Sequence, residues 1–98
     1  MGDRIRLSSQ ADLDVAETAV FLSRESALAG SRFLQEFELA LERLEENPRI
    51  GHRRRFITRP EMLVYGFRRW LIVYLADDTG IQVVRVIQGS RDLRRLDL

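Results

Sequence analysis

The sequence contains no cysteine and no lysine, and it has a single histidine among 98 residues. Without cysteine there can be no disulfide and no thiolate metal site, and His52 alone cannot form a multi-histidine cluster. We therefore expect no metal, no other cofactor and no small-molecule ligand. The absence of lysine also removes every side-chain amine that could act as a general base or a Schiff-base nucleophile.

Long apolar runs are missing as well, since none approaches the roughly 18 residues that mark a membrane span. The N-terminus lacks the basic and then apolar order of a signal peptide, so we expect a cytoplasmic location and no membrane association. Glycine and proline are too sparse for a fibrous or disordered chain. We expect residues 1–98 to form one domain, because a chain of this length supports a single core.

The charges that are present are distributed unevenly along the chain. Residues 10–47 contain nine acids and three arginines, whereas residues 48–98 contain eleven arginines and five acids. Subtraction gives a formal charge of −6 for the first segment and +6 for the second, although the whole chain carries only +1. Such a dipolar molecule can approach a polyanion through its basic part.

The clearest secondary-structure signal is a β-hairpin in the second half of the chain. Two runs rich in β-branched and aromatic residues, 70–75 and 81–87, flank a five-residue connection, 76–80, that has acidic and glycine turn chemistry. Another strand is expected over 62–67. Alternating polar and apolar residues predict a short first strand over 4–8.

Two helices are predicted between the first strand and the later ones. A capping pattern at Ser9 and Asp12 predicts the first helix over 10–24. Its apolar face is expected to comprise Leu13, Ala16, Ala19, Val20 and Leu22 or Phe21. Ser26 offers a cap for a second, amphipathic helix of roughly 18 to 20 residues, which Asn47-Pro48 ends. The expected fold is α+β, with an N-terminal strand and a two-helix antiparallel hairpin packed on a small, mainly antiparallel sheet, in the order β-α-α-β-β-β.

Four short motifs, spread over nearly the whole chain, are more specific. They are Ile5-Arg6-Leu7-Ser8 before Ala11-Asp12-Leu13-Asp14, Leu44 with Asn47-Pro48-Arg49-Ile50-Gly51, Arg69-Trp70-Leu71-Ile72-Val73-Tyr74, and Arg85-Val86-Ile87-Gln88-Gly89-Ser90-Arg91-Asp92-Leu93. In this order and spacing they resemble the ParE/RelE superfamily of bacterial toxins from type II toxin-antitoxin systems, and the ParE branch in particular. Within the last motif, Gln88 stands where many relatives have histidine.

The resemblance implies one of two activities. RelE-like members are ribosome-dependent mRNA endonucleases, whereas ParE-like members inhibit DNA gyrase. RNA cleavage needs groups that move protons near the working pH, and arginine can only stabilise phosphate charge because it is effectively always protonated. Few other groups remain, since Gln88 cannot titrate, His52 lies in a loop, Tyr74 is expected inside the hairpin, and the nearby carboxylates are Glu61 and Asp92.

The sequence therefore favours a binding toxin, a ParE-like gyrase inhibitor, and assigns no catalytic residue. The RelE-like nuclease acting on ribosome-bound mRNA stays an alternative, as does an inert protein that serves only as a partner in antitoxin autoregulation.

Candidate binding residues follow from the arginine pattern and from the resemblance. The surface expected to contact the target comprises Arg68, Arg69, Arg85, Gln88, Arg91, Arg94 and Arg95. The structural alternative for Arg69 and Arg85 is an ion pair with Asp92, Glu61 or an acid of the second helix. The resemblance also implies a cognate antitoxin in a hetero-oligomer, whose contacts are expected at an unpaired sheet edge or on the helix faces at Leu22, Leu28 and Leu39.

Overall fold

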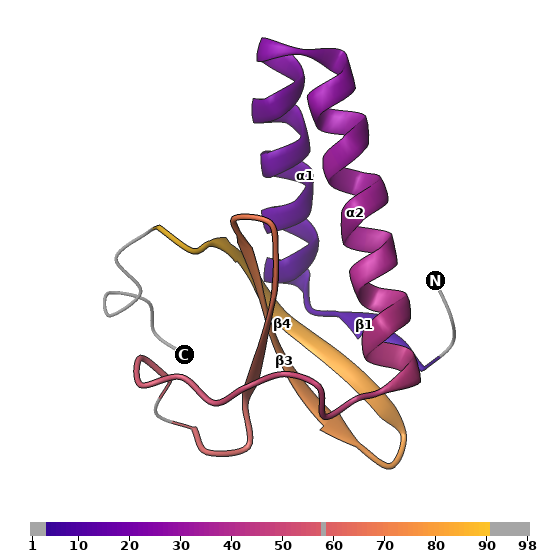
Figure 1. The fold of residues 1–98 in the computed structure, drawn as a ribbon, viewed down its shortest axis with the longest axis vertical. Helices are drawn as coiled ribbons and strands as arrows, with labels where there is room; N and C mark the ends of the chain where they lie inside the picture. The colour runs from indigo at the N-terminus through magenta and orange to yellow at the C-terminus, as the bar shows by residue number, and fades with distance from the viewer. Residues whose placement is uncertain (1–3, 58, 91–98) are drawn as a thin grey trace.

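The computed structural model describes residues 4–57 and 59–90 of the chain (Figure 1). Its elements are β1 (Ile5–Leu7), α1 (Ser9–Glu25), α2 (Ala27–Glu46), β2 (Leu63–Phe67), β3 (Trp70–Asp77) and β4 (Gly80–Gln88). This confirms the predicted α+β order. The predicted five-residue connection is too long, because β3 and β4 continue until Asp77 pairs with Gly80 and leave only Asp78 and Thr79 between the strands.

The four strands form one mixed sheet in the order β1-β4-β3-β2. The β2–β3 and β3–β4 pairs are antiparallel, whereas β1 runs parallel to β4, with Ile5 opposite Ile81. A parallel pair needs a long connection between its strands, which this chain provides because both helices follow β1. The outer strands are β1 and β2, on opposite edges.

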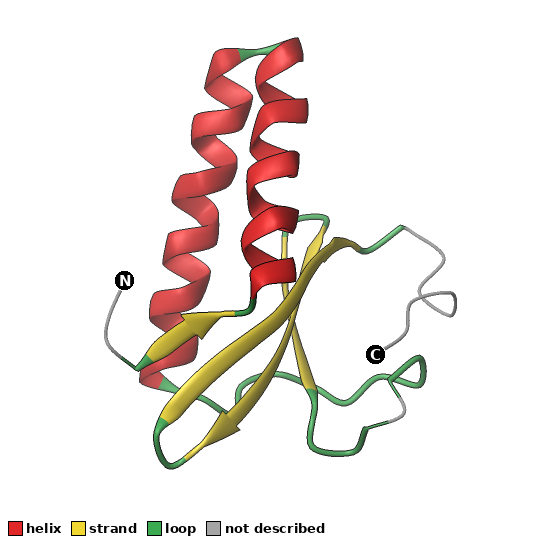
Figure 2. Ribbon diagram, turned by 180° about the vertical axis from the view of Figure 1, so that it is seen from behind, coloured by secondary structure: helices red, strands yellow, loops and turns green. Residues whose placement is uncertain are grey.

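The sheet is covered on both faces. Figures 1 and 2 show α1 and α2 side by side, with the link between them projecting beyond the sheet. One hydrophobic cluster joins Phe33, Phe37 and Leu44 of α2 to Ile72 and Tyr74 of β3. The second cluster lies on the opposite face, where the connector between α2 and β2 covers the sheet. The members of this cluster include Phe56, Ile57, Met62, Val64, Leu71, Val73 and Ile87. No helix within the described ranges is long and apolar enough to span a bilayer.

The buried face of α1 differs from the predicted one. Phe21 is 59 % exposed, and Leu13 and Val20 also lie at the surface, whereas Asp14 is buried. The residues of α1 that face the interior are Ala11, Asp14, Val15, Ala19 and Leu22. Ala19 and Leu22 were predicted correctly, whereas Leu13, Ala16, Val20 and Phe21 were not, because the helix turns Ala11, Asp14 and Val15 toward the interior.

The N-cap of α1 is Ser8, one residue before the predicted Ser9. Its hydroxyl accepts a hydrogen bond from the backbone N–H of Ala11 at 3.0 Å and donates one to the carbonyl oxygen of Val84 at 2.8 Å. Its backbone N–H donates to the carbonyl oxygen of Val83 at 2.9 Å. Ser8 therefore begins the helix and ends the pairing of β1 with β4. The second predicted cap is confirmed, since the Ser26 hydroxyl accepts from the N–H of Ala29 at 3.3 Å.

Candidate functional site

The turn between β2 and β3 brings predicted site residues together at one end of the sheet. Arg68 and Arg69 form this turn, and Trp70 at the start of β3 lies opposite Gln88 on β4. The backbone N–H of Gly89 donates to the carbonyl oxygen of Arg69 at 2.7 Å and ties the end of β4 to the turn. Arg68, Arg69 and Gln88 therefore share one end of the sheet.

The backbone of Arg68 has a left-handed conformation in the turn, whereas its guanidinium lies at the surface. Arg68 has a φ of 53°, in the left-handed region, which costs a non-glycine residue about 1 kcal/mol. Its Nε lies 2.9 Å from a carboxylate oxygen of Glu36 on α2, and the Arg68 side chain is 73 % exposed. An ion pair this exposed contributes little stability, so the guanidinium can exchange Glu36 for another anion.

Arg69 is anchored to the core through its neighbour. The central carbon of its guanidinium lies 5.8 Å from the centroid of the Trp70 ring, within the range of a cation–π contact. Trp70 in turn packs edge-on against Phe33, with the ring centroids 5.2 Å apart. Both arginines of the turn therefore border a hollow whose apolar side is made by Phe33 and Trp70.

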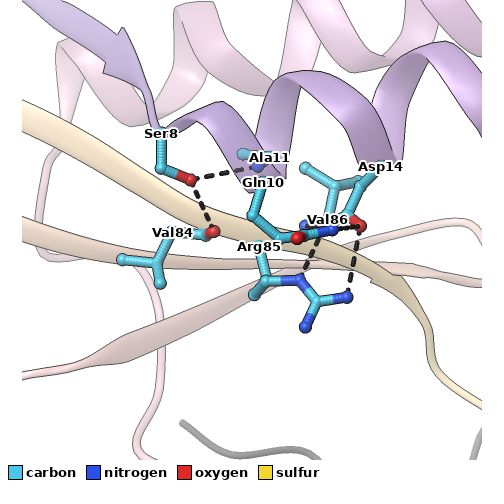
Figure 3. Close-up of polar contacts among 7 residues, drawn as sticks. All are labelled: Ser8, Gln10, Ala11, Asp14, Val84, Arg85 and Val86. Atoms are coloured by element: carbon cyan, nitrogen blue, oxygen red, sulfur yellow. Dashed lines mark hydrogen bonds and ion pairs between the residues drawn. The ribbon is translucent and has the colours of Figure 1, made fainter.

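Arg85 is held inside the molecule instead (Figure 3). Its Nε and Nη2 donate to the two carboxylate oxygens of Asp14 at 2.8 and 3.2 Å, and only 18 % of the Arg85 side chain is exposed. The same carboxylate accepts a bond from the backbone N–H of Val86 at 2.9 Å and one from Gln10 at 3.2 Å. The pairing of β1 with β4 ends at Val83, so no β1 carbonyl reaches the N–H of Val86. The Asp14 carboxylate accepts that hydrogen bond in place of a strand carbonyl.

Arg85 forms an ion pair, as the structural alternative expected, but its partner is an acid of the first helix and not Glu61 or an acid of the second helix. Glu61 bonds Arg59 instead, at 2.9 Å. The pairing arises because β1 ends at Leu7, so that the edge of β4 beyond Val84 faces the first turns of α1. The sequence analysis did not single out Asp14, although its position three residues after Ala11, on the same side of α1, was a usable signal.

Tyr74 joins two of the sequence motifs. It is fully buried, and its hydroxyl donates to the carbonyl oxygen of Pro48 at 2.8 Å and accepts from the N–H of Gly51 at 2.9 Å. A Cβ on Gly51 would lie only 2.6 Å from that hydroxyl oxygen, so glycine is needed for this close approach. The expectation that Tyr74 packs in the interior is confirmed, and both hydrogen bonds of its hydroxyl are internal.

Burial raises the pKa of Tyr74, which predicts a loss of stability at alkaline pH. Above about pH 10 the unfolded chain loses the phenolic proton while the folded chain keeps it, so the free energy of unfolding should fall by up to about 1.4 kcal/mol per pH unit until the folded pKa is reached. The absence of lysine and cysteine removes the side chains that usually mask this range. Denaturant unfolding at increasing pH measures the decline, which should be shallower in Tyr74→Phe. An equal decline in both proteins would contradict the prediction.

His52 does not belong to the same end of the sheet. Its backbone pairs with Val64 at the outer edge of β2. Strands β2 and β3 lie between it and β4, and three inter-strand spacings amount to roughly 14 Å. The imidazole and Gln88 therefore lie on separate parts of the protein.

The remaining predicted residues fall into two groups. Leu28 and Leu39 are 62 % and 57 % exposed, whereas Leu22 is partly buried against the core. The second group, Arg91, Arg94 and Arg95 of the predicted target surface and Asp92 among the predicted ion-pair partners, lies outside the described residues.

Comparison with known proteins gives one family. A family model described as the ParE toxin of type II toxin-antitoxin system, parDE, matches residues 5–93. The match runs from β1 through β4 and includes the turn arginines, Asp14 and Arg85. A comparison with curated proteins found no match.

Proposed function

Because the chain belongs to the ParE toxin family of type II toxin-antitoxin systems, which implies a cognate antitoxin partner, we propose that it inhibits DNA gyrase by binding and that the antitoxin neutralises it. The family match over residues 5–93 carries this proposal. In this proposal the toxin itself makes and breaks no covalent bond.

The proposed gyrase-binding surface is the end of the sheet formed by Arg68, Arg69 and Gln88. Guanidinium groups suit this role because they bind carboxylates and phosphates in a fixed, two-pronged geometry. The turn and Trp70 orient the two arginines before a partner arrives. Arg85 directs its charge at Asp14. We propose that Arg91, Arg94 and Arg95 also contact gyrase.

The positions of the proton-carrying groups favour binding over RNA cleavage. A nuclease of this kind needs an acid and a base within hydrogen-bonding reach of the scissile phosphate. Tyr74 uses its hydroxyl for two internal bonds, His52 lies across the sheet from β4, and Gln88 cannot titrate.

We propose that the antitoxin contacts the helix pair at Leu22, Leu28 and Leu39. Large apolar side chains that stay exposed on a folded protein are candidates for contacts with a protein partner. Several large apolar residues of the helix pair are exposed, and they are Leu13, Val20, Phe21, Leu28, Leu34 and Leu39. Their number is consistent with a protein that is stable as a hetero-complex.

A gyrase assay with turn variants tests the proposed surface. The Arg68→Ala/Arg69→Ala protein should need about 100-fold more toxin for half-inhibition of supercoiling, since two charged contacts of roughly 1.4 kcal/mol each are lost. Arg53→Ala/Arg54→Ala, in the exposed connector, is the matched control and should inhibit like the unaltered protein. Equal inhibition by both double variants would show that the turn is not the contact surface.

Expression without antitoxin separates the three possible activities. Gyrase inhibition should stop growth with double-strand DNA breaks and an SOS response. Transcripts cut at ribosomes would instead identify a RelE-like nuclease, and normal growth would identify an inert partner in autoregulation. Either of these two results would overturn the proposed function.

A further inference from the structure

The outer edge of β2 has backbone groups that are open to a further strand. Both backbone groups of Val64 point away from β3: its N–H donates to the carbonyl oxygen of His52 at 2.7 Å, and its carbonyl oxygen accepts from the N–H of His52 at 2.8 Å. Since strand residues alternate in direction, the N–H and carbonyl of Gly66 point the same way. Among the described residues, none pairs with Gly66 on this side, and Gly66 is exposed.

A groove with apolar walls and positive charge runs beside this edge. One hollow lies between α2 and β2, where Leu39, Ala40 and Phe67 give apolar surface and Arg43 and Arg68 give charge. A second hollow shares Glu36 and Arg68 with the first and continues to Arg32, Arg69 and Trp70. The residues that line the two hollows therefore include four arginines and one glutamate.

The opposite flank of α2 has the reverse charge. The groove there is bordered by Asp12, Glu38, Glu42 and Glu45, next to the edge strand β1. An acidic segment would be repelled from this flank and attracted to the β2 side. The two flanks thus discriminate between partners by charge.

We propose that an extended, acidic and apolar segment of the cognate antitoxin adds as a strand to β2 at Gly66. Its backbone pairs with the outward N–H and carbonyl of Gly66, its carboxylates bond Arg43 and Arg68, and an apolar side chain packs on Leu39. The assignment to an antitoxin rests on the family membership. Because Arg68 also belongs to the proposed gyrase-binding surface, the segment would neutralise the toxin by covering that residue.

Gly66 allows a direct test of the backbone contact. A Cβ at this position would lie 3.5 Å from Cδ2 of Leu71, an ordinary contact, so substitution is tolerated. Gly66→Pro removes the outward N–H, and proline fits an edge strand where that group faces solvent. Gly66→Ala adds a methyl but keeps the N–H, and is the matched control.

The probe is the purified cognate antitoxin, titrated calorimetrically into each full-length toxin variant. Gly66→Pro should raise the Kd at least about tenfold, and Gly66→Ala by no more than about threefold. The thermal unfolding of both variants checks that they remain folded. A Gly66→Pro protein that is folded and binds as tightly as Gly66→Ala would overturn the proposal.

Charge reversal on adjacent residues of α2 provides a second measurement that does not depend on the proline variant. Arg43→Glu should weaken antitoxin binding at least about tenfold, with a smaller effect at high salt. Glu42→Arg, on the other flank, should leave the Kd within about threefold, and the reverse pattern would place the antitoxin on the acidic flank and overturn the proposal. These affinities do not involve gyrase, so a toxin without effect on gyrase would overturn the proposed target and leave this docking site standing.

Discussion

Replacing Asp14 with alanine should lower the free energy of unfolding by about 3 to 5 kcal/mol, because it leaves the Arg85 charge without a partner in a largely buried place. The side chain of Arg85 is 18 % exposed, and its bonds to Asp14 are 2.8 and 3.2 Å long. The N–H of Val86 loses its acceptor as well. Urea unfolding of the two proteins measures the difference.

A neighbouring acid and a double variant separate the buried pair from a general effect of charge. Asp12→Ala removes an exposed carboxylate of the same helix and should cost less than about 1 kcal/mol. Asp14→Ala/Arg85→Leu removes both charges and should be more stable than Asp14→Ala alone, since no unpaired guanidinium remains. A double variant that is less stable than Asp14→Ala would contradict this account of the pair.

Gly80→Ala should destabilise the fold by about 4 kcal/mol, as the sum of backbone strain and overpacking. Gly80 has a φ of +134°, which side-chain-bearing residues rarely adopt. A Cβ there would overlap the carbonyl oxygen of Arg4 and lie 2.8 Å from its carbonyl carbon. That oxygen accepts the N–H of Ile81 at 2.7 Å, so the methyl group would displace β1 from β4.

The matched control for Gly80→Ala is Gly66→Ala, which places a methyl group on another strand of the same sheet. Its nearest contacts are 3.5 and 3.8 Å, and its effect should stay within about 1 kcal/mol. Urea unfolding gives the free energies, and amide hydrogen exchange at Ile81 reports on the β1–β4 pairing. Slow exchange at Ile81 together with unchanged stability in Gly80→Ala would show that β1 does not approach β4 this closely.

The tertiary structure divides arginines that the sequence placed in one target-binding set. Arg85 is committed to Asp14, Arg68 forms an exposed pair with Glu36, and Arg69 lies beside Trp70. These three environments predict three consequences of mutation. Loss of Arg85 should affect stability, whereas loss of Arg68 and Arg69 should affect binding while the fold is kept.

The sequence by itself determined the element types and their order. The β3–β4 hairpin follows from β-branched runs around acidic and glycine turn residues, and α2 follows from a Ser26 cap, a 3.6-residue apolar period and a terminating Asn47-Pro48. These signals are local, because turn chemistry, capping and periodicity depend on residues a few positions apart. The same local information, with the ordered motifs, was sufficient to indicate the toxin family.

Only the tertiary structure decided which charges are buried, which are paired and which remain at the surface. Asp14 and Arg85 are 71 residues apart, and they meet because β1 pairs in parallel with β4 and stops before the edge of β4 ends. The contact between Tyr74 and Gly51 and the outward direction of the Gly66 backbone likewise depend on strand order and on the path of the connector. Burial and partner choice are properties of packed surfaces, so composition and spacing along the chain do not specify them.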